Sequence, residues 1–260
     1  MKNKNIKLVI FGTLFKDIIV TTLQNLKKDF LDLSAFDSQI KDTYGGIYNI
    51  LKHKIKNEKW NLFSDSRNKI KNQKIFLNFK SIPKAIILEN FYKNRLSFVK
   101  KGEIKNYHNL RVEKNQIFLG FYLESLPIKI TSNLGTVVFD YNRSGDILNK
   151  KIFKNNFSKI NFLLGSANEL EWVKNYGNLN KNITIIEHSP KEVIIKKPFS
   201  KKKLYLKLKN KYFLKNSKKT IGLGDLFALY FARNLTNNLS IEENIKNIQL
   251  RIFDHIRKNN

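Results

Sequence analysis

The stretch "TIGLGDLFALYFARNL", residues 220–235, places one acidic residue between two glycines and a nearly uncharged run. Gly222 and Gly224 flank Leu223, Asp225 follows, and only one charged residue occurs in the next ten. Glycines let the backbone turn tightly, so that successive N–H groups can point into one concavity. The apolar run predicts a buried helix that begins here, and the first turn of a helix has unpaired N–H donors and the positive end of the helix dipole.

This turn predicts a binding site for a phosphate-like anion. The negative charge of Asp225 would repel an anion, so anion binding alone does not explain an acidic residue at this position. A carboxylate in this place can accept the proton of a hydroxyl that attacks a phosphorus atom held beside it. Taken alone, however, the short pattern favours an ordinary loop-to-helix turn with Asp225 as the N-cap. Other parts of the sequence are needed to distinguish a base beside an anion site from an ordinary N-cap.

Short apolar runs recur along the 260 residues, with helix-like segments between them. The run "IKLVIFG" (6–12) is continuous and ends in glycine, which is typical of a strand buried on both faces of a sheet. Helical composition is found in residues 45–55 and 167–176, and further strand candidates are residues 84–90, 116–123, 135–142, 160–169 and 182–188. The alternation predicts an α/β fold with a largely parallel sheet covered by helices, in a single domain over residues 1–260.

Two segments interrupt this alternation. Residues 17–44 and 91–115 carry more polar runs of β-type composition, which are better suited to a small, half-exposed sheet. We expect them to form an appendage to the α/β domain.

The last twenty residues predict an amphipathic helix. Ser240 and Glu243 have the spacing of a capping box, in which each side chain binds the backbone N–H of the other residue. The isoleucines that follow recur at helical spacing, which predicts a stripe that packs on the core: Ile241, Ile245, Ile248, Ile252 and Ile256.

The charge of the chain is strongly basic, with 49 Lys and Arg against 21 Asp and Glu and a net charge of +28. Such a charge is typical of nucleic-acid-binding proteins. Lysine greatly outnumbers arginine, however, and arginine-rich stacking clusters and RNA-binding aromatic motifs are missing from the sequence. Lysine, asparagine and isoleucine together are what A/T-rich codons encode. We therefore favour genome composition as the cause, and keep a basic nucleic-acid-binding protein as the less favoured alternative.

The sequence contains no cysteine, which excludes disulfides and thiolate metal sites. Its four histidines share no metal-ligand spacing, so a structural zinc site is not expected. Residues 1–20 have the basic head and apolar run of a signal peptide, but Lys16 and Asp17 interrupt the run. No run approaches the ~18–20 apolar residues that span a bilayer. We expect a cytoplasmic protein with no membrane partner.

The turn at 222–225 resembles the "GAGD" signature of the ribokinase-like, PfkB-type sugar kinases. The likeness continues through "DLFALYF" (225–231), where members of that family often show D-A-F-x-A-G-F. Other stretches resemble further motifs of the family and follow in the family's order: Gly12 with Asp17 five residues later, "GGIYN" (45–49), "FDYN" (139–142) and "ANELE" (167–171). Five such stretches in the correct order are far more specific than any one of them.

The resemblance implies a three-layer ribokinase-like sandwich, with a largely parallel central sheet and a small β-lid built from residues 17–44 and 91–115. It implies a kinase that uses ATP and Mg²⁺ and transfers the γ-phosphoryl group to a hydroxyl of a sugar or sugar phosphate. Asp225 would be the general base. The N–H groups of Gly222, Leu223 and Gly224 would hold the transferring phosphoryl group as its charge develops.

For the acceptor side, the resemblance implies that Asp17, Gly45, Gly46 and Asn49 bind sugar hydroxyls, for which short polar side chains and close backbone approach are suited. The lid would close over the sugar and exclude water. In some relatives two lids pair, so a homodimer through the lid is left open.

For the nucleotide side, the resemblance implies roles for Asn168 and Glu171, which lie one helical turn apart and would face the same way. In the family that face organises Mg²⁺ through water and the nucleotide phosphates, so no direct metal ligand is expected. Thr220 keeps the place of a threonine that commonly precedes the glycines in the family.

The nucleotide side also departs from the family. Where members usually have a T-x-G-x-x-G loop, this chain reads "IIEHSPKE" (185–192), without a glycine. Only 35 residues follow Asp225, about half of what many members use for the adenine pocket. A catalytically silent member that binds a sugar or nucleotide is therefore the main alternative to a kinase.

Overall fold

The computed structural model describes residues 6–22, 39–65, 67, 74–90, 95–141, 149–174, 182–189, 192–200, 203–207, 222–237 and 239–259. Within these residues the central sheet runs in the order β16-β15-β14-β13-β12-β10-β1-β3-β4. The bounds of these strands are β1 (Lys7–Thr22), β3 (Lys59–Phe63), β4 (Lys74–Phe76), β10 (Gln116–Phe121), β12 (Thr136–Asp140), β13 (Phe162–Gly165), β14 (Thr184–His188), β15 (Glu192–Lys196) and β16 (Lys203–Lys207).

The sheet is parallel from β4 to β14, and only β15 and β16 pair antiparallel at its far edge. Ile10 of β1 is paired with Leu119 of β10 on one side and with Trp60 of β3 on the other, and all three side chains are buried. Such strands are apolar on both faces because helices or strands cover both faces of the sheet. The predicted α/β fold with a largely parallel sheet is confirmed.

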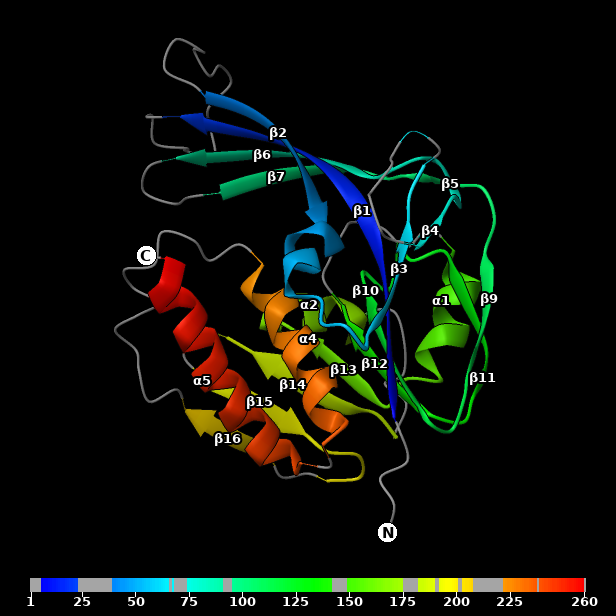
Figure 1. The fold of residues 1–260 in the computed structure, drawn as a ribbon, viewed down its shortest axis with the longest axis vertical. Helices are drawn as coiled ribbons and strands as arrows, with labels where there is room; N and C mark the ends of the chain where they lie inside the picture. The colour runs from blue at the N-terminus through cyan, green and yellow to red at the C-terminus, as the bar shows by residue number, and fades with distance from the viewer. Residues whose placement is uncertain are drawn as a thin grey trace.

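Two hydrophobic clusters, one on each face of the sheet, give the three layers (Figure 1). On one face lie α4 (Leu223–Leu235), α5 (Ile241–Asn259) and the 3₁₀ helix η2 (Ile47–His53). On the other lie α1 (Lys150–Phe157) and α2 (Ala167–Lys174). This is the sandwich that the sequence predicts, and α4 is the buried helix expected after the glycine turn.

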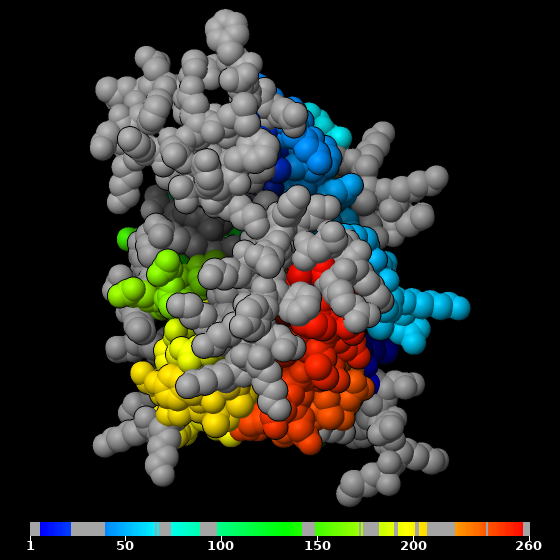
Figure 2. Space-filling model, turned by 90° about the vertical axis from the view of Figure 1, so that its left-hand side faces the viewer, coloured from blue at the N-terminus to red at the C-terminus, as the bar shows by residue number. Residues whose placement is uncertain are grey.

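Helix α5 begins with the predicted capping box. The backbone N–H of Ser240 donates to Oε2 of Glu243 at 3.0 Å, and the N–H of Glu243 donates to Oγ of Ser240 at 3.2 Å. Its isoleucine stripe packs on the core, with Ile245 and Ile248 fully buried. In Figure 2, α5 (red) lies beside the β15–β16 region (yellow) on one face of the molecule. An ion pair joins Lys197, which follows β15, to Glu242 of α5 at 3.2 Å.

Strand β1 is long enough to belong to two sheets. Its first half pairs in the central sheet, and from Leu14 onward it pairs with β2 (Gln39–Gly46) and then with β6 (Lys84–Asn90). β7 (Arg95–Lys100) pairs antiparallel with β6 and completes a small sheet that projects from the domain (Figure 1). We call this small sheet, β2-β1-β6-β7, the lid sheet.

The lid sheet differs from the predicted segments in its boundaries. Residues 84–90, which the alternation assigned to the main sheet, form its strand β6. Residues 103–112 lie outside it: β8 (Glu103–Ile104) pairs with β5 (Phe79–Ser81), and β9 (His108–Val112) pairs with β11 (Ile128–Asn133). The predicted lid residues 23–38 and 91–94 lie outside the described residues. Composition reveals a half-exposed strand but not its pairing partner, which long-range contacts decide.

No helix in the described part of the chain is both long and apolar enough to cross a membrane.

Candidate active site

The candidate site lies where the parallel strands end, at the carboxyl edge of the central sheet, the usual place for ligands in α/β folds. Tyr122 follows β10 directly, Asp140 is the last residue of β12 and His188 is the last residue of β14. The N–H of Tyr122 donates to the backbone oxygen of Asp140 at 3.2 Å, which ties two of these strand ends together. Helix α4 begins at the same edge.

The glycine turn of the motif is a left-handed N-cap. Gly222 has φ 80° and ψ 3°, a conformation that residues with a Cβ rarely adopt, and no side chain caps the helix at this residue. Its carbonyl oxygen accepts the N–H of Leu226 at 2.9 Å, which begins the helical ladder. Asp225 lies in the first turn and is only 3% exposed. A carboxylate is thus buried in the first turn of a helix, next to its N-terminus.

Asn49 reaches this turn from a distant part of the chain. It lies on η2, which follows Gly46, itself in a left-handed conformation with φ 65°. A Cβ atom on Gly222 would lie 3.5 Å from the Cβ of Asn49 and 3.9 Å from Oδ2 of Asp225. The structure therefore brings together Asn49, Gly222 and Asp225, which the sequence singled out as acceptor site, anion turn and base.

Asp17 and Gly45 are neighbours across the lid sheet. β1 and β2 pair Phe15 with Gly45 and Asp17 with Thr43. A Cβ atom on Gly45 would overlap the carboxylate of Asp17, so this carboxylate lies in the space that glycine leaves. Asp17 also lies close enough to Tyr122 for its charge to raise the pKa of the phenol. The lid sheet and the carboxyl edge therefore meet at these residues.

Tyr122 is a site residue that the sequence did not single out. It has φ 61°, is 6% exposed, and packs its ring on Phe15 with centroids 4.8 Å apart. Its hydroxyl lies 3.5 Å from Oδ1 of Asp225. Burial, followed by the charges of Asp225, Asp140, Asp17 and Glu169, raises its pKa well above the usual value near 10. The only signal in the sequence was its place directly after a buried strand that ends at this edge.

The candidate nucleotide-side residues on α2 are exposed. Asn168 and Glu171 both face solvent, and none of the described contacts connects them to Asp225. Glu169, which follows Asn168, is partly buried: its Oε2 accepts the backbone N–H and the hydroxyl of Ser166, each at 2.7 Å. The sequence thus singled out two residues of the helix and missed Glu169, whose charge reaches Tyr122. Thr220 lies outside the described residues.

No group of three or more histidine, aspartate or glutamate side chains among the described residues could hold a metal ion directly. The oxygen-bearing side chains of Asn168 and Glu171 are open to solvent, which suits contact with a hydrated Mg²⁺ ion that is bound mainly by nucleotide phosphates. The residues present therefore fit an Mg²⁺ ion held through water.

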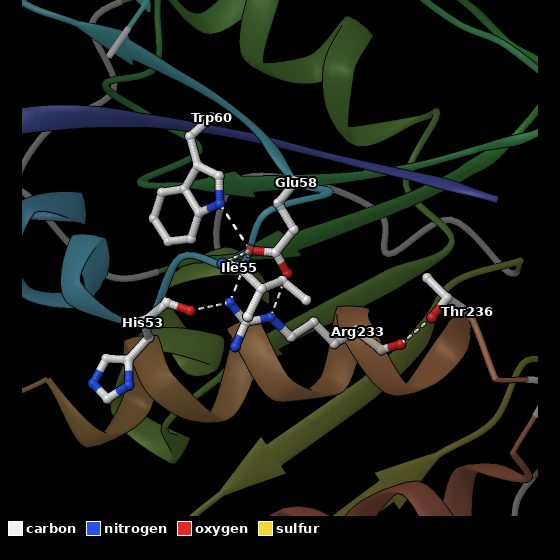
Figure 3. A network of polar contacts seen from close by, with 6 residues as sticks. All are labelled: His53, Ile55, Glu58, Trp60, Arg233 and Thr236. Atoms are coloured by element: carbon white, nitrogen blue, oxygen red, sulfur yellow. Dashed lines mark hydrogen bonds and ion pairs between the residues drawn. The ribbon is translucent and has the colours of Figure 1, made fainter. Parts of the chain in front are cut away.

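A buried ion pair fixes α4 against the loop that follows η2 (Figure 3). Arg233 of α4 binds Glu58 through Nε and also through Nη2, the latter at 2.8 Å from Oε2, and Nη2 donates to the backbone oxygen of His53. Oε2 of Glu58 also accepts the indole N–H of Trp60 at 2.9 Å. Side-chain exposure is 12% for Arg233 and 3% for Glu58. The network joins the helix that carries Asp225 to the segment that carries Asn49.

Comparison with known proteins finds solved structures that share this fold. No protein-family model and no curated protein sequence matches the chain. Several solved structures do. Ribokinase from Giardia lamblia has a TM-score of 0.67 at 10% identity, covering 96% of this chain and 92% of that one. The nucleoside kinase of Methanocaldococcus jannaschii, an archaeal member of the ribokinase family, has 0.61 at 16% identity, covering 94% and 89%.

A ribokinase from Cryptococcus neoformans, solved in complex with ADP, has a TM-score of 0.62 at 14% identity and covers 96% of this chain and 92% of its own. These likenesses extend over almost the whole length of both proteins in each pair. Together with the sheet order, the three layers and the lid sheet, they show that this chain has the ribokinase-like fold.

Proposed function

We propose that this protein is an ATP-dependent kinase that transfers the γ-phosphoryl group to a hydroxyl of a sugar or sugar phosphate. The observation that carries the proposal is the meeting of Asp225 and Asn49 at Gly222, the left-handed N-cap of α4. The side chains proposed as base and as acceptor contact thus lie close to a helix N-terminus that suits an anion. The ribokinase-like fold, whose solved members include a complex with ADP, supports the same reaction.

In this mechanism the acceptor hydroxyl is held by Asn49, Asp17 and the backbone at Gly45 and Gly46. Asp225 takes the proton of that hydroxyl as its oxygen attacks phosphorus.

The N–H groups at Gly222, Leu223 and Gly224 then stabilise the charge that develops on the transferring group. Mg²⁺, when bound with ATP, neutralises phosphate charge, and Asn168 and Glu171 would contact it through water. The lid sheet excludes water while the group moves.

The proposed acceptor carries a sugar hydroxyl, which free sugars, sugar phosphates and nucleosides all have. A nucleoside kinase is among the similar structures, and the acceptor group of a nucleoside is also a sugar hydroxyl. Nucleosides therefore belong in the same substrate panel.

One structural feature favours the alternative, a catalytically silent protein that binds a sugar or nucleotide. β14 and β15 pair antiparallel at the place where members of the resembling family usually have a glycine-rich nucleotide loop. Such a protein would bind a sugar or nucleotide without transferring phosphate.

The deciding experiment measures Mg²⁺-dependent ATP turnover with sugars, sugar phosphates and nucleosides, for the wild type and for Asp225→Asn. The proposal predicts turnover with one acceptor and a loss of about 10²–10⁴-fold in kcat in the variant, the usual contribution of a general base. Asp254→Asn, an exposed substitution on α5, is the matched control and should leave kcat unchanged. ATP binding without turnover for any acceptor would instead favour the silent binder.

We also propose that two copies pair through the outer face of the lid sheet. Ile86 and Phe98 are directly opposite one another in the β6–β7 register and are 44% and 60% exposed, and Ile40 on β2 is 70% exposed. Large apolar side chains gathered on one sheet face are typical of an interaction surface.

A further inference from the structure

His188 stands at the end of β14, against the first turn of α4. If Gly224 carried a Cβ atom, that atom would lie 3.3 Å from Cε1 and 3.9 Å from Nε2 of His188. The ring also packs on Phe227 of the same helix, with centroids 4.9 Å apart and planes inclined at 33°. Because Gly224 has no side chain, the edge of the imidazole that carries Nε2 lies directly against the N-terminus of α4.

Nε2 of His188 is closed off from solvent, and it has no hydrogen-bond partner among the described residues. A buried polar nitrogen without a partner is rare in folded proteins, since it has lost water and gained nothing in exchange. A ligand that brings an acceptor to this point would complete its hydrogen bonding. The neighbouring N–H groups of the α4 N-terminus favour an anionic acceptor.

The two ends of the glycine turn have different neighbours. Asn49 lies against Gly222, whereas His188 lies against Gly224. Since Asn49 is the candidate contact of the phosphoryl acceptor, the group next to Gly224 is placed to contact the phosphoryl donor.

Two backbone N–H groups just beyond His188 already have hydrogen-bond acceptors within the β14–β15 hairpin. The N–H of Ser189 donates to the backbone oxygen of Glu192 at 3.0 Å, and the N–H of Glu192 donates to Oγ of Ser189 at 3.1 Å. These N–H groups are not available to a phosphate, as those of an open glycine-rich loop would be. Among the described residues, the imidazole of His188 offers a side-chain donor at the same strand end.

We propose that the Nε2–H group of His188 donates a hydrogen bond to a phosphate of the nucleotide bound at the N-terminus of α4. The proposal deepens the kinase function proposed above and rests on it for the identity of the nucleotide. It assigns the recognition of donor phosphate partly to a side chain, in place of a glycine-rich loop.

The charged groups around His188 come from several elements. Glu169 of α2 and Glu187 of β14 favour the protonated ring, but burial outweighs them, and the pKa of His188 lies below its usual value near 6.5. Glu187 is paired with Lys196 of β15 at 2.8 Å, and Asp225 of α4 follows Gly224. The ring is thus neutral at pH 7 and serves as a neutral donor, and an arriving phosphate charge would raise its pKa.

The test is a titration of the wild-type protein with pyrophosphate and, separately, with ADP, followed by the imidazole ¹H and ¹⁵N signals. The chain has only four histidines, so the variant His188→Gln assigns the signal of His188 by its disappearance. Signals of His188 that shift with either probe, while those of His53, His108 and His255 do not, support the proposal. Unmoved His188 signals at saturating pyrophosphate and ADP, or no binding of either probe, overturn it.

Affinity for ADP gives a second readout. His188→Leu should bind ADP about tenfold more weakly or worse, the effect of losing a hydrogen bond to a charged group. His188→Gln retains an N–H donor and should lose less. Wild-type affinity in His188→Leu would overturn the proposal. If pyrophosphate shifts the His188 signals but the protein transfers phosphate to no acceptor, the His188 site is supported and the kinase function is refuted. The failure of this proposal can therefore be distinguished from the failure of the proposed function.

Discussion

The phenolic oxygen of Tyr122 lies 3.5 Å from Oδ1 of Asp225, although 103 residues separate them in the chain. The raised pKa of Tyr122 keeps this hydroxyl protonated at neutral pH, so that it can only donate to the carboxylate. A donated hydrogen bond stabilises the charged form of a carboxylate. In the proposed mechanism, Tyr122 would therefore favour the ionised form of the candidate base Asp225.

Tyr122→Phe should consequently move the acid limb of the pH profile of kcat/KM to higher pH, because Asp225 loses a donor to its charged form. The measurement is a pH–rate profile with the best acceptor from the substrate panel. Tyr107→Phe is the control, since burial alone raises the pKa of Tyr107 and no carboxylate contributes. An acid limb that stays in place in Tyr122→Phe would show that the 3.5 Å contact has no influence on the base.

Gly45→Ala should raise KM for the acceptor by about tenfold while leaving KM for ATP unchanged. The added methyl group would occupy the space of the Asp17 carboxylate and displace it from the candidate acceptor site. A tenfold change corresponds to about 1.4 kcal/mol, the size of one lost hydrogen bond.

The control is a double-mutant cycle with Asp17→Ala. Once the carboxylate is absent, the methyl group at residue 45 has nothing to displace, and its effect should largely disappear. Additive effects of the two substitutions would contradict this steric explanation.

Arg233→Met should lower the free energy of unfolding by about 3–5 kcal/mol, because it leaves the buried carboxylate of Glu58 without its partner. The measurement is urea denaturation, with the m-value checked for constancy. Glu242→Gln removes the more exposed pair with Lys197 and should cost about 1 kcal/mol or less. Equal losses of unfolding free energy in the two variants would mean that the buried pair shown in Figure 3 stabilises the fold no more than the exposed pair does.

Stability should fall as the pH is lowered from about 6.5 towards 4. The pKa of His53 is lowered from 6.5 to about 4, first by burial and then by the charges of His255, Lys52 and Arg233. Between these two values the unfolded chain binds a proton that the folded chain does not, so protonation favours unfolding; above about 6.5 this loss is absent. His53→Gln should therefore show a smaller fall in Tm between pH 7.5 and pH 4.5 than the wild type. Parallel curves would rule out His53 as a source of the pH dependence.

Phe98→Asp should produce a monomer if two copies pair through the lid sheet. The substitution places a charge in the middle of the exposed apolar face, beside Ile86, where a second copy would bury it without a partner. Light scattering after size-exclusion chromatography measures the mass. A wild-type protein that is already monomeric at working concentration would contradict the proposed dimer, and a dimer that survives the substitution would place its interface elsewhere.

Local sequence determined the elements themselves. The apolar run from residue 6 predicts the buried strand β1, the glycines at 222 and 224 predict the start of α4, and Ser240 with Glu243 predicts the cap of α5, because each pattern acts within a few residues of chain. Five stretches that resemble motifs of the ribokinase-like kinases, in the order of that family, predicted the ribokinase-like fold. Asp225, buried at its helix N-terminus, could be selected as a candidate base from sequence alone.

The tertiary structure decided which residues meet. β1 continues through Lys16 and Asp17 into the lid sheet because β2 and β6 pair with it there, and no local pattern encodes that pairing. Tyr122 adopts a left-handed φ, and contacts from Phe15 and Asp225 surround it. The contact of His188 with Gly224 likewise joins a strand end to a distant helix. Such contacts depend on register and packing between remote segments, whereas propensity and periodicity report only on the segment itself.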